Sequence, residues 1–317
     1  MTRAQPGFID VHAHFSPPTT VQTRQAVFEA SRANNFLVPE PYEWRLDATL
    51  DFMNETGTAM QLLSNVPTRH EALRASNDYG RDIVARHPAR FGLLAALPTD
   101  DAHTAVDEAS RVGDADGWAV RTVYNGHSLA ESDLDPLWDR LNHQHAVVFV
   151  HPNAYAPSTA GLPTPLVEVA FDTGRTITGM LYAGVFNRYP HITFLVAHAG
   201  GAIPLLAGRL SLLGTEAWVP NPHGLTAADI RIALARLWVD TAASASDQQL
   251  AAAVATFGDD HVVYGSDWGV ACTTATSARR NIHALNTTHA ISPATRAAIP
   301  TRAAHLFPRA IHRAQQR

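Results

Sequence analysis

The stretch GFIDVHAHF, residues 7–15, sets the pattern from which the fold can be read. It is a short apolar run that ends in two histidines, His12 and His14, one residue apart. In a β-strand, residues i and i+2 point to the same face, so both imidazoles can hold one metal ion. A second pair, His143 and His145, has the same spacing. Spacing alone therefore identifies no site, and the position of each pair in the fold has to decide.

Seven further apolar runs follow the first one along the chain. The eight predicted strands span residues 7–12, 58–64, 90–97, 117–123, 146–151, 192–198, 236–241 and 262–267. Their nearly continuous apolar character is typical of parallel strands that are buried on both faces. Helical patterns lie between them, for example at 71–87, 104–113 and 133–144. Eight strand-and-helix units predict an α/β protein, a (β/α)8 TIM barrel that forms a single domain over residues 1–317.

A doubly wound parallel sheet is the alternative fold, but no Gly-x-Gly-x-x-Gly motif follows any predicted strand. Two long irregular stretches, residues 16–46 and 152–165, are rich in proline, asparagine and tyrosine. We expect both to be loops that cover the mouth of the barrel.

Composition excludes several classes of protein. Hydrophobic residues make up 46% of the chain and the net charge is −5, which indicates a globular protein without a nucleic-acid-binding surface. The absence of a membrane-length apolar run or signal-peptide pattern, with Cys272 as the one cysteine, predicts a cytoplasmic protein. The chain contains no lysine, which excludes a lysine Schiff base, a Walker-type phosphate loop and a metal pair bridged by carboxylated lysine.

Possible metal ligands stand at the ends of four predicted strands. His12 and His14 end the first strand, and the fifth, sixth and eighth end at His151, His198 and Asp267. Active sites of TIM barrels lie at the C-terminal ends of the strands, so these side chains should meet at one mouth. Imidazole and carboxylate suit zinc or a neighbouring divalent ion. His143 and His145 precede the fifth strand, at the other end of the barrel, and we expect no function for them.

These motifs resemble those of the amidohydrolase superfamily. The chain has His-x-His, then FVHP (149–152), LVAHAGG (195–201) and GSDWG (265–269), in that order. The branch that it resembles includes aminocarboxymuconate-semialdehyde, γ-resorcylate and 6-methylsalicylate decarboxylases. The segments 44–67, 85–98 and 171–210 read like that branch, and 171–210 looks most like the 6-methylsalicylate-type members.

The resemblance implies a metal-dependent enzyme with a small-molecule substrate. Its ligands would be His12, His14, His151 and Asp267, with His198 beside the ion as a base or orienting group. We expect one divalent ion, Zn²⁺ as the first expectation and Mn²⁺ as the second. Members of the family are commonly dimers or larger, so a homo-oligomer is expected, with no nucleic-acid or membrane partner.

Substrate contacts are predicted with an ordinary structural role as the alternative for each. The arginine that aminocarboxymuconate enzymes carry before the residue matching Trp44 is missing, which leaves Arg175 as a replacement or as an ion-pair partner of Asp172. Three aromatic side chains could wall an aromatic substrate or simply pack, and Asn125 could bind substrate or only form a turn. The three aromatic side chains are Phe15, Tyr155 and Trp268. Asp240, at the end of the seventh strand, could orient a ligand histidine.

Two reactions are compatible with this ligand set. In the first, the ion binds the carboxylate and hydroxyl of an aromatic acid, and Asp267 gives a proton to the ring carbon that loses carbon dioxide. In the second, water bound to the ion attacks an ester, lactone or amide after Asp267 or His198 takes its proton. The resemblance favours decarboxylation over hydrolysis, and over a non-catalytic member of the fold.

Overall fold

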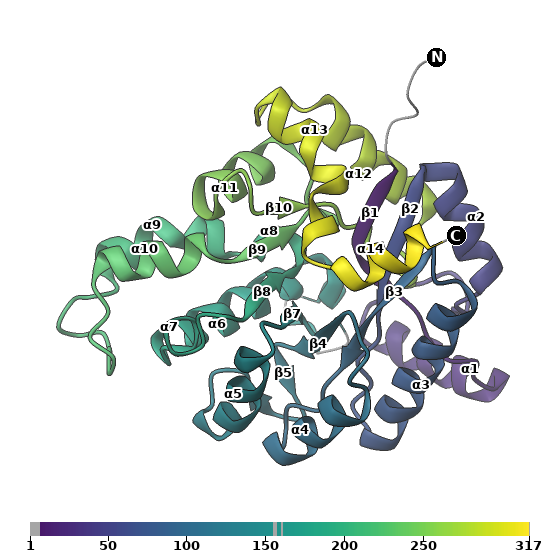
Figure 1. The fold of residues 1–317 in the computed structure, drawn as a ribbon, viewed down its shortest axis with the longest axis horizontal. Coiled ribbons are helices and arrows are strands. Elements are labelled where there is room, and N and C mark those ends of the chain that lie inside the picture. Colours follow the sequence, from purple (N-terminus) through teal and green to yellow (C-terminus); the bar gives the residue numbers. More distant parts are fainter. Residues whose placement is uncertain (1–6, 155–156, 160, 317) are drawn as a thin grey trace.

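The computed structural model describes residues 7–154, 157–159 and 161–316. Eight parallel strands form one sheet in the order β1-β2-β3-β4-β7-β8-β9-β10 (Figure 1). The strands are β1 Phe8–His14, β2 Thr58–Ser64, β3 Phe91–Ala96, β4 Gly117–Arg121, β7 Val147–His151, β8 Thr193–Val196, β9 Trp238–Asp240 and β10 Val262–Val263. A separate hairpin consists of β5 Val123–Tyr124 and β6 His127–Ser128. All eight predicted strands are present.

The first and last strands close the sheet into a barrel. The amide of Val11 donates to the carbonyl of Tyr264 at 3.0 Å, and the amide of Asp267 donates to the carbonyl of His12 at 2.8 Å. The final strand was predicted to reach residue 267 but ends at Val263. Beyond it the chain passes so close to β1 and β9 that a Cβ on Gly265 would lie 2.9 Å from that of His12. The predicted (β/α)8 fold is confirmed.

Helices surround the strands, as Figure 1 shows. They are α1 Val21–Ala33, α2 Leu46–Thr56, α3 His70–Arg86, α4 Ala102–Arg111, α5 Asp135–His143, α6 Glu168–Tyr182, α7 Val185–Arg188, α8 Ala197–Gly200, α9 Ile203–Leu213, α10 Ala227–Ala235, α11 Asp247–Phe257, α12 Ala275–Thr287, α13 Pro293–Arg302 and α14 Pro308–Gln315. The helical patterns at 71–87, 104–113 and 133–144 correspond to α3, α4 and α5. None of these described helices is long and apolar enough to cross a membrane.

The first predicted mouth loop is wrong in part, because it contains α1. Thr20 caps this helix by accepting a hydrogen bond from the amide of Thr23 at 3.1 Å. Within α1 the one buried side chain is Ser31, so the helix has no apolar stripe from which its period could be read. The second predicted loop, 152–165, ends in a short 3₁₀ turn at Thr164–Leu166, and three of its residues lie outside the described part of the chain.

A buried polar network joins the strands on both sides of the barrel closure. Asp10 on β1 accepts hydrogen bonds from the side-chain amide of Gln61 at 2.9 Å and from the amide and hydroxyl of Ser266 at 2.9 and 2.5 Å. Burial raises the pKa of Asp10 to about 6, although these hydrogen bonds oppose the rise. The network therefore links β1 to β2 and to the segment after β10, directly beneath His12.

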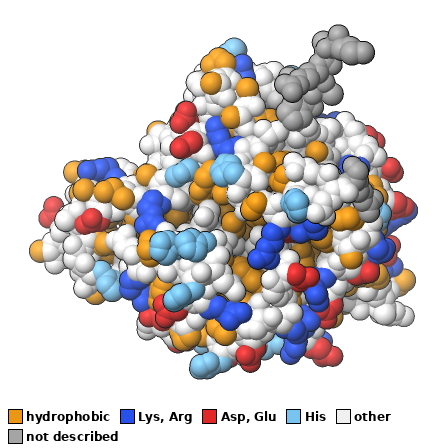
Figure 2. Space-filling model, viewed as in Figure 1, with side chains coloured by type: hydrophobic (Ala, Val, Ile, Leu, Met, Phe, Trp, Pro, Cys, Tyr) orange, Lys and Arg blue, Asp and Glu red, His pale blue; other side chains and the backbone are white. Residues whose placement is uncertain are grey.

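The surface carries both signs of charge. On the face shown in Figure 2, arginine and acidic side chains are interspersed, and no single basic patch dominates. Apolar side chains also reach this surface over α9 and α10, at the left of the molecule.

Candidate metal centre

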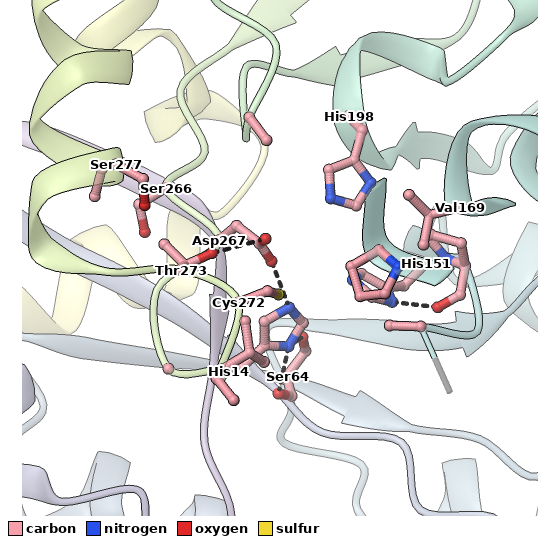
Figure 3. Close-up of a pocket in the computed structure, with 18 of the residues that line it drawn as sticks. His14, Ser64, His151, Val169, His198, Ser266, Asp267, Cys272, Thr273 and Ser277 are labelled. Carbon is pink, nitrogen blue, oxygen red and sulfur yellow. Dashed lines mark hydrogen bonds and ion pairs between the residues drawn. The ribbon is translucent and has the colours of Figure 1, made fainter. Parts of the chain in front are cut away.

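The ends of three strands bring four possible metal ligands together. They are His12 and His14 on β1, His151 at the end of β7 and Asp267 after β10, and their ligand atoms all lie within 4.8 Å of one another. Figure 3 shows His14, His151 and Asp267 side by side at the cavity, with His198 facing them. Parallel strands of a closed barrel end at one rim, which explains why residues far apart in sequence meet here.

The distances inside the cluster are those between ligands of one ion. Nε2 of His12 lies 3.1 Å from Nε2 of His14, and each nitrogen lies 3.2 Å from Oδ1 of Asp267. Ligand atoms at the corners of a tetrahedron around zinc are about 3.3 Å apart, given bonds of roughly 2.0–2.1 Å. The three atoms therefore have the spacing that a divalent ion requires.

The outer nitrogen of each ligand imidazole faces an oxygen that can accept a hydrogen bond. The acceptors are Oδ2 of Asp240 at 2.9 Å for His12, the carbonyl of Ser64 at 3.3 Å for His14 and the carbonyl of Pro152 at 2.7 Å for His151. Nδ1 of His12 and of His151 therefore carries a hydrogen, and Nε2 of each ring can give its lone pair to a metal once it carries no proton. Nδ1 of His14 also lies 3.3 Å from the hydroxyl of Ser64, which can donate or accept. Asp240 thus stands where its place at the end of the seventh predicted strand would let it orient a ligand histidine.

One buried atom in the cluster lacks a partner among the described residues. Nε2 of His151 is buried and accepts no hydrogen bond. Such an unpaired polar atom costs about 1–3 kcal/mol, and an ion bound between the four side chains would satisfy it. The residues thus fit one divalent metal ion, and the lysine-free sequence has no carboxylated lysine that could bridge a second.

Electrostatics in the centre depend on two buried carboxylates. Burial lowers the pKa of His12, but the carboxylates of Asp240 and Asp267 raise it to about 10. Burial raises the pKa of Asp267, while hydrogen bonds from the two β1 histidines hold it well below its usual value. The pKa of His151 lies well below its usual value, chiefly because of burial and then because of His14. Binding of a divalent ion would consequently displace a proton from His12.

His198 lies beside the cluster on an unusual piece of backbone. It follows β8 with φ 55° and ψ 52°, in the left-handed region that side chains other than glycine rarely adopt. Its amide donates to Oδ1 of Asp240 at 3.1 Å, and its ring centre is 4.9 Å from that of His12 and 5.7 Å from that of His151. Burial and the charge on His12 lower its pKa. Its Nδ1 is buried and unpartnered among the described residues, so it is available to a bound molecule.

A cavity of about 440 Å³ opens beside the centre. Its wall includes His14, His151, His198 and Asp267, and much of the remaining wall is apolar or aromatic. Phe15 contributes to the wall and packs against Trp44 and Tyr79 with ring centres 6.2 Å away. Thr273 donates to Oδ2 of Asp267 at 3.0 Å and so fixes the second carboxylate oxygen. The cavity has the size and lining of a site for a small aromatic molecule.

Three predicted substrate contacts lie away from this cavity. Trp268 stacks on Phe52 with ring centres 3.9 Å apart and donates to the hydroxyl of Thr49 at 3.2 Å. Its chain neighbour Asp267 has a left-handed backbone, with φ 59°, which sends the two side chains to different sides of the strand ends. We therefore correct the expectation that Trp268 walls the substrate.

Asn125 and Arg175 also require correction. Asn125 is exposed in the turn of the β5–β6 hairpin, where it donates to the carbonyl of Thr68 and to Asp100. Arg175 is exposed on α6 and lines a second hollow beside α9, and it is not part of the wall of the cavity at the metal centre. Asp172 accepts a hydrogen bond from the hydroxyl of Thr122 instead of pairing with Arg175. Tyr155 lies outside the described residues.

Two residues of the cavity were missed by sequence reasoning. Arg121 ends β4 and lines the wall, and Thr273 holds Asp267 from the loop after β10. A signal existed for Arg121, because it ends a predicted strand just as His151 does. No signal existed for Thr273, since its contact depends on how the loop folds back.

The sequence model of the amidohydrolase family matches residues 9–308. The chain belongs to the amidohydrolase family. The decarboxylase macB of Penicillium terrestre is 30% identical over 294 residues, which cover 82% of this chain and 83% of that protein. The 6-methylsalicylic acid decarboxylase of Penicillium expansum is 29% identical over 277 residues, which cover 82% and 84%.

Solved structures share the fold of this amidohydrolase chain. A dihydroxybenzoic acid decarboxylase from Polaromonas, crystallised with manganese and the inhibitor 2-nitroresorcinol, superposes with a TM-score of 0.77. The two chains are 21% identical, and the alignment covers 95% of this chain and 97% of that one. At this identity the likeness establishes the barrel, which agrees with the closure of the sheet described above.

Proposed function

We propose that this chain is a metal-dependent, non-oxidative decarboxylase of a hydroxybenzoate-type acid. The observation that carries the proposal is the centre itself: three imidazoles and one carboxylate converge beside a largely apolar cavity. Relatives named as decarboxylases, including a 6-methylsalicylic acid decarboxylase, support the choice of reaction. The enzyme is thus a carboxy-lyase, as the sequence predicted.

We assign one divalent ion to His12, His14, His151 and Asp267. When bound, the ion supplies a Lewis acid that holds the carboxylate and neighbouring hydroxyl oxygen of the substrate. Zn²⁺ is our first expectation, because three imidazole nitrogens and one carboxylate oxygen are donors that suit it. Mn²⁺ is the second, since the same donor types accept it and one relative was crystallised with it.

Asp267 is placed to move the proton. Its carboxylate first takes a proton, which the hydroxyl of the bound substrate supplies, and then transfers it to the ring carbon that bears the carboxylate. The bond from that carbon to the carboxylate breaks, its electron pair restores the aromatic ring and carbon dioxide leaves. The resulting phenolate takes a proton from water. Thr273 keeps the carboxylate aimed at the cavity during these steps.

His198 is assigned to the substrate oxygen. Its buried Nδ1, which has no partner among the described residues, can hydrogen-bond a hydroxyl or carboxylate oxygen that lies against the metal centre. Asp240 holds the backbone of His198 with one oxygen and the ring of His12 with the other. The same carboxylate therefore fixes the position of a metal ligand and of this second histidine relative to each other.

A substrate screen tests the proposal. Protein loaded with zinc or manganese is incubated with 6-methylsalicylate and γ-resorcylate in D₂O, and carbon dioxide and the deuterium content of the product are measured. Decarboxylation predicts carbon dioxide and one deuterium at the carbon that lost it. Release of acid from aryl esters or lactones, with no reaction on any hydroxybenzoate, would favour hydrolysis by metal-bound water instead.

A cytoplasmic location and a homo-oligomer are two further proposals. Apolar side chains on α9 and in the loop after it support an interface, because Leu205, Leu212 and Trp218 are 81%, 73% and 69% exposed. If a second copy covers this surface, Leu212→Glu should lower the mass measured by light scattering to that of one chain. If Leu212→Glu keeps the mass of the wild-type oligomer, the interface lies elsewhere. If wild-type protein is itself a monomer, the proposed homo-oligomer is refuted.

A further inference from the structure

Arg121 is the last residue of β4 and lines the cavity beside the metal centre. Strand β4 runs parallel to β7, and Arg121 stands directly opposite the ligand His151 in this pairing. Side chains two residues apart in a strand share a face. Ala119 packs inside the barrel in the same cluster as Phe149, so Arg121 and His151 follow them on the inner face at the rim.

The charge of Arg121 is unusual for its surroundings. The chain has no lysine, and among the described residues that line this cavity, Arg121 is the one side chain with a permanent positive charge. Its Nη1 donates to Oδ1 of Asn153 at 3.2 Å, and the amide of Asn153 donates to Asp172 at 3.3 Å. These bonds fix the guanidinium against the loop after β7. A fixed cation on a largely apolar wall favours a bound anion.

We infer that Arg121 binds the substrate carboxylate on the side away from the metal ion. This inference rests on the proposed function and narrows it to aromatic acids whose carboxylate lies between the ends of β4 and β7. A carboxylate has lone pairs enough to accept from a guanidinium while it also contacts an ion. Arg121 thus takes the role that sequence analysis gave to Arg175.

The chemistry of the reaction predicts how Arg121 contributes. Carbon dioxide is neutral, and the phenolic product has lost the carboxylate, so the interaction with Arg121 exists before the reaction and not after it. Removing it should raise KM for the acid more than it lowers kcat. Affinity for the phenolic product should not change, since that molecule no longer carries the group that Arg121 recognises.

The test compares two ligands of equal shape and different charge. Binding of benzoate and of benzamide to metal-loaded protein is measured by calorimetry for wild type, Arg121→Gln and Arg121→Lys. Charged hydrogen bonds of this kind predict a roughly 10- to 100-fold loss of benzoate affinity in Arg121→Gln. Benzamide affinity should stay within about threefold, and Arg121→Lys should recover part of the benzoate affinity because it keeps the charge.

A matched control is Arg86→Gln, because Arg86 is an exposed arginine at the end of α3 that pairs with Asp82. It should bind both ligands like wild type.

The inference is overturned if Arg121→Gln leaves benzoate affinity within threefold of wild type. It is also overturned if the affinities for benzoate and benzamide fall equally while metal content and melting temperature are unchanged. If Arg121→Gln loses the metal or does not fold, Arg121→Lys becomes the test. The inference then requires that Arg121→Lys still binds benzoate more tightly than benzamide, and equal affinity for the two ligands would overturn it. Wild-type protein that binds benzoate through Arg121 but decarboxylates no hydroxybenzoate would refute the proposed reaction while supporting this inference.

Discussion

His12 and His14 have the same spacing as His143 and His145, yet the two pairs lie at opposite ends of the barrel. The first pair sits at the C-terminal end of β1, buried among His151, His198 and Asp267. In the second pair, His143 ends α5 and His145 lies in the loop before β7, and both are exposed. Whether a His-x-His pair can hold a metal ion therefore depends on its position in the barrel, and the spacing of the two histidines does not decide it.

The supporting contacts of the two pairs differ as much as their positions. Nδ1 of His12 faces a buried carboxylate of Asp240 at 2.9 Å, which is itself held by two backbone amides. Nδ1 of His143 faces a carbonyl of its own helix at 2.7 Å, and the ring of His145 lies 4.6 Å from that of His191. Only the first arrangement fixes an imidazole from a neighbouring strand, as a preorganised metal site requires.

The largest expected effect comes from removing one histidine of each pair. His12→Ala should lose the bound metal, and turnover should fall below about 1% of wild type, because loss of a ligand exceeds the roughly 10- to 100-fold effect of losing an outer partner. His143→Ala should keep the bound metal and the wild-type turnover. Elemental analysis and carbon dioxide release measure the two properties. An active His12→Ala beside an inactive His143→Ala would reverse the comparison.

An intermediate effect is expected from the carboxylate behind His12. Asp240→Asn keeps an oxygen for the backbone amides but removes the charge that fixes the imidazole, so metal affinity should fall roughly 10- to 100-fold. Competition with a chelating dye measures it. Asp82→Asn, an exposed partner of Arg86 on α3, is the matched control and should change nothing. Equal affinity in both variants would show that Asp240 does not orient the ligand.

The fold could be predicted because its signal is repeated. Eight apolar runs separated by helical patterns specify a parallel barrel, and the eight predicted strands are the eight found. Strand-end position also selected the histidine pair that lies in the cluster with His151 and Asp267. These predictions depend only on backbone topology. The topology decides at which end of the barrel a residue lies, whatever its side chain contacts.

Side-chain direction after a strand end could not be predicted. Trp268 follows Asp267, but the left-handed backbone at Asp267 directs the indole to Phe52 and away from the cavity. Arg175 falls on the exposed side of α6, whereas Arg121 reaches the cavity from a strand end. Sequence position therefore predicted which side chains cluster at the rim better than it predicted which side chains line the cavity.

The smallest expected effect compares these chain neighbours. Trp268→Phe removes the indole donor to Thr49 and part of the stacking on Phe52, so the free energy of unfolding should fall by about 1 kcal/mol. KM should stay within about twofold, because the ring lies away from the cavity. Urea unfolding and steady-state kinetics measure the two quantities. A tenfold rise in KM with an unchanged free energy of unfolding would show that Trp268 contacts the substrate after all.

The most direct measurement of the central claim is anomalous X-ray diffraction from crystals grown with zinc or manganese. One peak per chain is predicted, about 2.0–2.2 Å from Nε2 of His12, His14 and His151 and from a carboxylate oxygen of Asp267. A peak beside His143 and His145, a second peak inside the barrel, or a metal-loaded enzyme with no peak at the four ligands would contradict the account.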